Sequence, residues 1–126
     1  MNNKRLGTEF EKEVCEALAL CGYWAHFIVP DARGAQPFDI VAAKDGHALA
    51  IDCKTCVAKS FNITRLEDNQ TMAFRLWRRC GNGEGLIFVK HKGKIYVIGF
   101  DRLIEEQTVP LNSAMTFDEW SKKDDI

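Results

Sequence analysis

The chain has 126 residues, which is enough for one hydrophobic core and too few for two ordinary domains. Hydrophobic residues make up 46% and charged residues 28%, so the chain is globular, and its net charge of −1 lacks the basic excess of a strong nucleic-acid binder. No apolar run reaches the roughly 18 residues of a membrane span and the N-terminus is charged, so we expect an intracellular protein without a membrane partner.

Apolar residues at helical spacing predict a first helix that begins near Thr8 and ends before Gly22. Thr8 and Glu11 have the T-x-x-E form of a capping box, which marks the start of a helix. The aromatic and β-branched residues of 23–29 predict a strand, and the Gly and Pro residues of 31–37 predict a loop.

Asp45-Gly46 is the favoured two-residue turn of a β-hairpin. With this turn, Lys44 pairs with His47, and counting outward places Asp39 directly opposite Asp52. Because side chains alternate across a strand, Lys54 points to the same face as Asp52. The opposite face is predicted to be wholly apolar, with Phe38, Ile40, Ala42, Leu49, Ile51 and Cys53.

Turn residues and capping boxes predict the other elements. They are strands at 38–43 and 48–55, a helix from a capping box at Thr64 and Glu67 to Cys80, a hairpin of 85–90 and 94–100 around Gly93, a helix at 101–107 and a last helix capped by Thr116 and Glu119. The order α-β-β-β-α-β-β predicts a mixed α/β fold with a central mixed β-sheet flanked by helices.

The charge is unevenly distributed along the chain. Residues 1–104 carry 15 Lys and Arg against 12 Asp and Glu, whereas residues 105–126 carry 2 against 6. A weakly basic body with an acidic tail is compatible with phosphate binding but does not require it. We predict a single domain over 1–126, with its core at about 5–107 and an acidic tail at 108–126.

Five cysteines in such a chain suggest reduced thiols. Cys53 and Cys56 form one C-x-x-C pair, but no second pair or H-x-H follows at zinc-finger spacing. A thiol-redox or zinc protein is therefore a weak alternative. We interpret four of the cysteines as small buried hydrophobic residues, namely Cys15, Cys21, Cys53 and Cys80.

Asp39 and Asp52 together indicate a metal site. Two carboxylates opposite each other destabilise a hairpin, and their Cβ separation of about 4.5–5.5 Å suits one hard cation between them. The cation would polarise a phosphoryl oxygen and acidify a water, and Lys54 would orient that water or stabilise negative charge. From the residues alone, a lysine that neutralises a surface pair of aspartates explains the pattern equally well.

Three short motifs carry a family resemblance: Gly7-x-x-x-Glu11 on the first helix, Pro37-Phe38-Asp39 on one strand and Asp52-x-Lys54 on the next. In this order and spacing they resemble the PD-(D/E)xK nuclease superfamily. The chain is especially similar to its Holliday-junction resolvases, the archaeal Hjc type and the bacterial RecU type. Residues 60–64, followed by Gln70, are similar to the RecU-type pattern after the catalytic lysine.

The resemblance implies a restriction-endonuclease-like core and a role for each matched residue. The implied metal ligands are Asp39, Asp52, the Cys53 backbone carbonyl and Glu11, the last directly or through water. The implied catalytic residues are Lys54, Glu11 and Gln70, the last supporting the site or contacting the DNA backbone. The resemblance also implies dependence on Mg²⁺, for which Mn²⁺ can substitute, a homodimer, and cleavage of branched DNA.

Glu11 and Gln70 each have a second interpretation. Glu11 occupies the third position of the capping box and could simply cap the helix. Glu9 comes from the same turn and is a competing candidate, although the spacing from Gly7 favours Glu11. Gln70 lies on an apolar helix stripe, where a polar group needs a partner, and that partner could be an ordinary backbone carbonyl.

Several basic residues are candidates for a DNA surface. They are Arg33 in the loop before Asp39, Arg75 and Arg79 on the second helix, and Lys90 and Lys92 near the last hairpin turn. A solvated helix face and a charged turn explain these residues at least as well.

We therefore predict a metal-dependent, structure-specific DNA endonuclease of DNA recombination and repair, most closely a Holliday-junction resolvase. Its partners would be branched or duplex DNA and a second copy of the chain. The alternatives are a restriction-like or DNA-repair nuclease of the same superfamily, and a catalytically inactive DNA-binding member. The complete set of Asp39, Asp52 and Lys54 argues against the inactive alternative.

Overall fold

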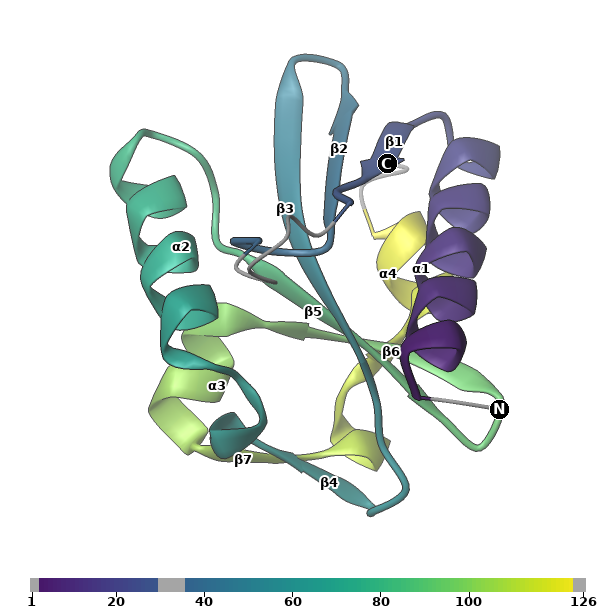
Figure 1. Ribbon diagram of the computed structural model, residues 1–126, viewed down its shortest axis with the longest axis vertical. Helices are drawn as coiled ribbons and strands as arrows, with labels where there is room; N and C mark the ends of the chain where they lie inside the picture. Colours follow the sequence, from purple (N-terminus) through teal and green to yellow (C-terminus); the bar gives the residue numbers. More distant parts are fainter. Residues whose placement is uncertain (1–2, 30–35, 124–126) are drawn as a thin grey trace.

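The computed structural model describes residues 3–29 and 36–123, and its centre is a six-stranded sheet (Figure 1). The strand order is β1-β2-β3-β5-β6-β8, in which only the neighbours β3 and β5 run parallel. The strands are Trp24–Phe27 (β1), Ile40–Lys44 (β2), His47–Thr55 (β3), Leu86–His91 (β5), Lys94–Gly99 (β6) and Met115–Thr116 (β8). The predicted central mixed β-sheet is confirmed.

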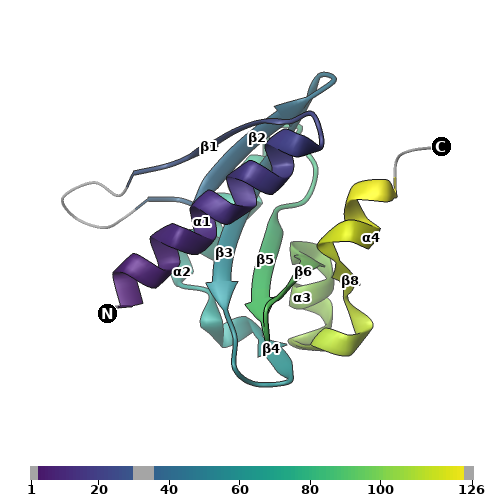
Figure 2. The same ribbon diagram turned by 90° about the vertical axis from the view of Figure 1, so that its right-hand side faces the viewer.

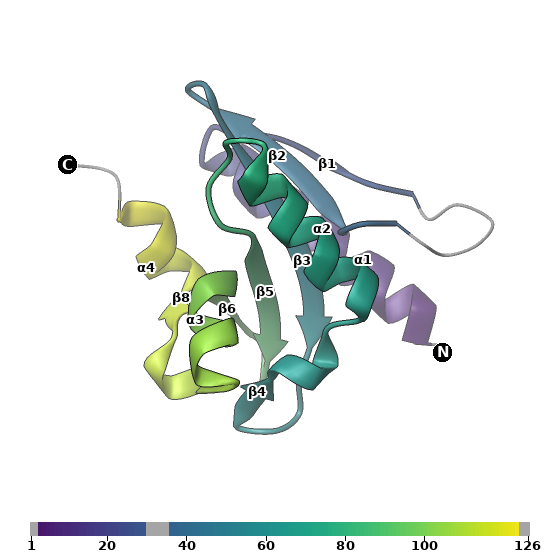
Figure 3. The same ribbon diagram turned by 90° about the vertical axis from the view of Figure 1, so that its left-hand side faces the viewer.

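Helices cover both faces of this sheet, as Figures 2 and 3 show from opposite sides. One face carries α1 (Asn3–Leu20) and α4 (Phe117–Lys122), and the other carries α2 (Asp68–Arg79) and α3 (Phe100–Glu106). A small second sheet pairs β4 (Ser60–Asn62) with β7 (Thr108–Pro110). None of the helices within the described ranges has the length and apolar character needed to traverse a lipid bilayer.

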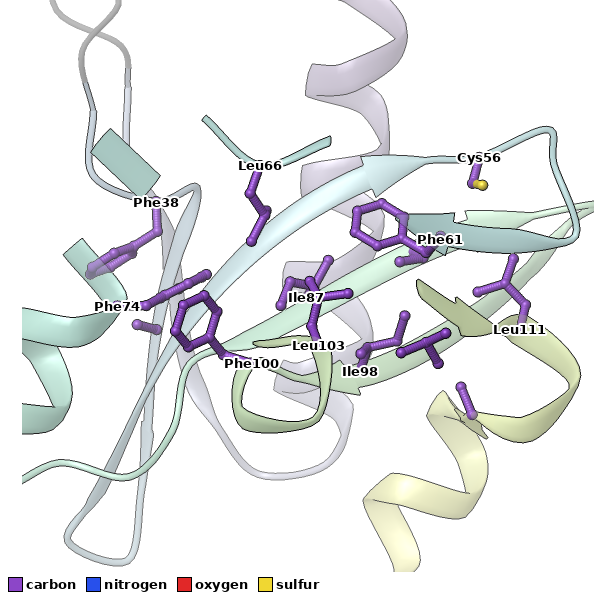
Figure 4. Close-up of a cluster of buried hydrophobic side chains, with 14 residues drawn as sticks. Phe38, Cys56, Phe61, Leu66, Phe74, Ile87, Ile98, Phe100, Leu103 and Leu111 are labelled. Carbon is purple, nitrogen blue, oxygen red and sulfur yellow. The ribbon is translucent and has the colours of Figure 1, made fainter. Parts of the chain in front are cut away.

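Two apolar clusters hold the three layers together. The α2-side cluster, drawn in Figure 4, packs Phe61, Phe74, Ile87, Phe100 and Leu103 with several neighbours. The α1-side cluster packs Phe10, Val14 and Leu18 of α1 on Ile40, Ile51 and Phe88 of the sheet. Each fully buried side chain of this size contributes about 1.5–3 kcal/mol, so both faces of β3 are firmly anchored.

The hairpin of β2 and β3 has the register that its turn predicts, with Ile40 opposite Ile51 and Lys44 opposite His47. Asp45 and Gly46 have φ angles of 52° and 78°, as a type I′ turn requires. Five of the six predicted apolar residues pack on the α1 side. The exception is Phe38, which belongs to the α2-side cluster. That prediction is wrong because β2 begins only at Ile40, so the alternation does not reach back to Phe38.

Both predicted capping boxes in the first part of the chain are wrong. α1 begins at Asn3, so Thr8 and Glu11 lie inside the helix and not at its start. α2 is preceded by a short 3₁₀ turn, Ile63–Arg65, and its real capping box joins Glu67 to Gln70. In α1 the T-x-x-E pattern occurs in a helix interior, so the pattern alone does not mark a helix start. In the second case Thr64 belongs to the 3₁₀ turn, and the helix begins three residues later than the pattern predicts.

The C-terminal region is part of the packed fold. β7 pairs with β4, β8 pairs with β6, and Val109 and Leu111 are buried in the α2-side cluster. The predicted core boundary at 107 is therefore too early. The sequence did not reveal β7 and β8 because strands of two or three residues are too short to show a hydrophobic period. The capping box of Thr116 and Glu119 is confirmed at the start of α4.

The hairpin of β5 and β6 and the helix α3 are present where the sequence predicts them. All five cysteines are free thiols. Of the four that were predicted to be buried, Cys15, Cys21 and Cys53 are half-buried and Cys80 is exposed, so the prediction is wrong for Cys80. Cys80 caps the C-terminal end of α2, beyond the part of that helix that packs on the sheet.

Candidate active site

Asp39 and Asp52 lie together at the end of the β2–β3 hairpin and are almost completely buried. Asp52 is 0% exposed and Asp39 is 6% exposed. Asp39 Oδ2 accepts a hydrogen bond from the Cys53 backbone N–H at 2.7 Å, which holds the Asp39 carboxylate against β3. Burial, followed by the charge of Asp39, raises the pKa of Asp52 well above its usual value. Two neighbouring carboxylates in such surroundings favour a bound cation.

Lys54 points at this pair, as the hairpin register predicts. Its side chain is only 18% exposed, and Nζ lies 3.3 Å from Asp52 Oδ2. The same ammonium donates a hydrogen bond to Gln70 Oε1 at 3.3 Å. The lysine is therefore held in place from two sides and is not a solvated surface charge.

Gln70 connects α2 to both residues of the Asp52-x-Lys54 motif. Its Nε2 donates to Asp52 Oδ1 at 2.8 Å, and its Oε1 also accepts a hydrogen bond from the Glu67 backbone N–H at 3.0 Å. The orientation of the amide follows from its partners, because an ionised carboxylate only accepts and an ammonium only donates. The partner that this buried amide requires is therefore the site itself and not a backbone carbonyl.

Glu11 approaches the same place from the other face of the sheet. Figures 2 and 3 show the N-terminal halves of α1 and α2 on either side of the carboxyl end of β3. Burial, followed by the charge of Asp39, raises the pKa of Glu11 to about 7. Glu9 is exposed on the same helix. The geometry favours Glu11 as the acid from the helix, and its position inside α1 rules out a capping role.

The residues at this site fit a divalent cation. Asp52 Oδ2 is buried, and its contact within the described ranges is the 3.3 Å ion pair with Lys54, without a hydrogen bond of good geometry. No three His, Cys, Asp or Glu side chains of those ranges form a closed metal cage. Mg²⁺ does not need such a cage, because it keeps several waters and binds through one or two carboxylates and substrate phosphates. Asp39 and Asp52 supply that number.

Two of the five predicted DNA contacts lie at the same end of the sheet. Lys90 is in register with Thr55, the residue after Lys54, and it forms a 2.6 Å ion pair with Glu13 of α1. Lys92 is exposed in the turn between β5 and β6. Arg33 lies outside the described residues.

The predicted arginines of α2 lie away from the site. At a rise of about 1.5 Å per residue, Arg75 is roughly 8 Å and Arg79 roughly 14 Å from Gln70 along the helix axis. Both side chains are exposed. Neither arginine therefore lies beside Asp52 and Lys54.

Arg65 is a further basic residue beside the site, and the sequence did not predict it. Its Nη2 donates to the backbone carbonyl of Thr55 at 2.8 Å, so a guanidinium lies beside the end of β3. The residue occupies a 3₁₀ turn between β4 and α2 that has no signature in the sequence. The only signal was its position directly after residues 60–64, which resemble the RecU-type pattern.

The family model of the archaeal Holliday junction resolvases (Hjc) matches residues 2–118. Among solved structures, the chain is similar to Hjc of Archaeoglobus fulgidus, described as a Holliday junction resolvase from an archaeal hyperthermophile. That match has a TM-score of 0.68 at 20% sequence identity and covers 91% of this chain and 98% of the other, which shows a shared fold. No curated protein matches the sequence.

Proposed function

The chain belongs to the archaeal Holliday junction resolvase (Hjc) family, and we propose that it resolves DNA junctions at the site of Asp39, Asp52 and Lys54. The family is one of nucleases that bind branched DNA. The observation that carries the proposal is the buried pair of aspartates with the Lys54 ammonium 3.3 Å from Asp52. A buried arrangement of this kind has a clear use in phosphodiester hydrolysis and little value for stability.

Asp39 and Asp52 would hold Mg²⁺, with the Cys53 backbone carbonyl as a third ligand and Glu11 bound directly or through water; Mn²⁺ would substitute. The bound ion supplies Lewis-acid polarisation of the phosphoryl oxygen and a more acidic water. Lys54 orients that water and stabilises the negative charge that develops on the phosphate. Gln70 acts as a positioning residue, because it holds both Asp52 and Lys54.

We further propose that the protein acts as a homodimer. A four-way junction presents two equivalent strands, and a two-fold symmetric dimer would place one site on each. Sedimentation equilibrium should then give the mass of two chains. A monomer that still makes paired nicks would contradict this part of the proposal.

A cleavage assay tests the proposed function. The protein is incubated with four-way, flap, linear duplex and single-stranded DNA, in Mg²⁺ or in EDTA. We expect symmetric nicks near the centre of the four-way junction, and none in EDTA. Lys54→Ala should lower the rate at least 100-fold, because an electrostatic contribution of this kind is worth about 2.7–4 kcal/mol. Lys122→Ala removes the same charge from an exposed position of α4, and this variant should cut like the wild type.

Three other outcomes would change the conclusion. Equal cutting of linear duplex would favour the restriction-like or repair nuclease. Junction binding without any cutting would favour the inactive DNA-binding member. Cleavage that survives Lys54→Ala would contradict the assigned site.

A further inference from the structure

A cavity of about 190 Å³ lies beside the carboxyl ends of β3 and β5, between the small β4–β7 sheet and β6. Its polar lining consists of Lys59, Ser60, His91, Tyr96 and Asn112. One ammonium, two hydroxyls and one amide offer hydrogen-bond donors, and no carboxylate lines the cavity. A lining of this kind is suited to an oxyanion.

His91 is the buried part of this lining. It is only 8% exposed, and its Nδ1 lies 2.8 Å from the backbone carbonyl of Cys56. A carbonyl can only accept, so Nδ1 carries the proton, and in a neutral imidazole Nε2 is then an acceptor. A phosphate diester also only accepts, so the buried imidazole forms a fixed wall of the cavity, and the ammonium, the hydroxyls and the amide supply the donors.

The cavity is close to the candidate active site but separate from it. Cys56, whose carbonyl orients His91, follows Lys54 by two residues, which is about 7 Å of extended chain. The Cys56 N–H in turn bonds the Lys90 carbonyl at 2.9 Å, which continues the β3–β5 pairing. Figure 4 places Cys56 and Leu111 at the Phe61 end of the α2-side cluster, and Figures 2 and 3 place β4 just beyond the ends of β3 and β5.

We propose that this cavity binds a backbone phosphate of the DNA strand, within a few nucleotides of the bond that is cut. The proposal rests on the proposed function. Successive nucleotides of one strand rise by about 3.4 Å, so a site this close to Lys54 lies within reach of the same strand. A phosphate held here would position the junction arm and would take no part in the chemistry.

Binding without cleavage provides the first test. The affinity for a four-way junction is measured by fluorescence anisotropy in EDTA over a series of KCl concentrations. Lys59→Ala and Tyr96→Phe should each weaken binding several-fold, and Lys59→Ala should also reduce the slope of log K against log salt by about 0.9. Lys122→Ala is the matched control and should change neither. Affinities and slopes equal to the wild type for both cavity variants would overturn the proposal.

A single neutral phosphate in the DNA locates the contact. Methylphosphonates are placed one at a time near the cleavage position, and each is tested with the wild type and with Lys59→Ala. At one position the methylphosphonate should weaken binding by the wild type. The same methylphosphonate should have little further effect on binding by the Lys59→Ala variant, because the two changes remove the same contact. Full additivity at every position would overturn the proposal. If the cavity variants bind like the wild type but the junction is still cut, the proposed function stands and the phosphate site does not. If the junction is not cut but the methylphosphonate and Lys59→Ala are non-additive, the phosphate site stands and the proposed function does not.

Discussion

Gln70 joins α2 to both Asp52 and Lys54 of β3. Its amide donates to Asp52 and accepts from Lys54, while the Glu67 N–H fixes the same oxygen. The capping box of α2 and the candidate active site therefore share one residue. A change at Gln70 acts on the geometry of the site through the orientation of its partners.

Gln70→Ala should lower both metal affinity and cleavage rate by about 10- to 100-fold, the usual effect of removing a group that orients a metal ligand. Titration of the cleavage rate with Mg²⁺ measures the metal affinity. Asn69→Ala, at an exposed position in the same helical turn, is the control and should behave like the wild type. A Gln70→Ala enzyme with an unchanged Mg²⁺ requirement would show that the amide serves only the helix.

At this scale, the relation of Asp39, Asp52 and Lys54 could be predicted from the sequence because one turn and the alternation of side chains determine it. The partner of Gln70 could not be predicted, because that contact depends on how α2 crosses the sheet. The sequence also left open whether Glu11 caps the helix or belongs to the site. The same four-residue pattern occurs at a helix start and inside a helix, and only the position of Asn3 settles where α1 begins.

At the scale of elements, local signals decided what could be predicted. The two hairpins are specified by Asp45-Gly46 and by Lys92-Gly93, whose positive φ angles suit a tight turn. β4, β7 and β8 have only two or three residues each and exist because neighbouring strands and helices hold them. No window of sequence is long enough to reveal such strands.

The contribution of α4 to the free energy of unfolding can be measured by removing the side chain of Trp120. The ring of Trp120 lies 5.5 Å from that of Phe88 in the sheet and stacks on Tyr23 at 6.1 Å. Trp120→Ala should lower the free energy of unfolding by about 2 kcal/mol, less than for a full cavity because Trp120 is half-buried. Urea unfolding followed by circular dichroism measures the change. Trp24→Ala removes a tryptophan that is 63% exposed and should cost less than about 0.5 kcal/mol. Equal effects would mean that α4 is dispensable.

At the scale of the whole molecule, the site is assembled from both faces of the sheet. α1 brings Glu11, the β2–β3 hairpin brings the aspartates and the lysine, and α2 brings Gln70. The parallel pairing of β3 and β5 requires a crossover through β4 and α2, so no local signal specifies it. This arrangement concentrates three carboxylates at one end of the fold, and their repulsion opposes folding when no cation is bound.

The stability of the metal-free protein should therefore decrease as the pH rises. The pKa of Glu11 is about 7 in the folded chain against 4.5 for an ordinary glutamate, so the unfolded chain releases this proton first as the pH rises. Between these values the folded chain holds more protons, so the free energy of unfolding falls as the pH rises and stays low above pH 7. Glu11→Gln removes this loss of stability and should raise the free energy of unfolding above pH 7 by about 1 kcal/mol, after allowance for solvent screening at a half-buried site. In EDTA, its melting temperature should exceed that of the wild type at pH 8 and match it at pH 4. Glu9→Gln makes the same charge change on an exposed part of α1, and an equal gain there would refute the assignment to Glu11.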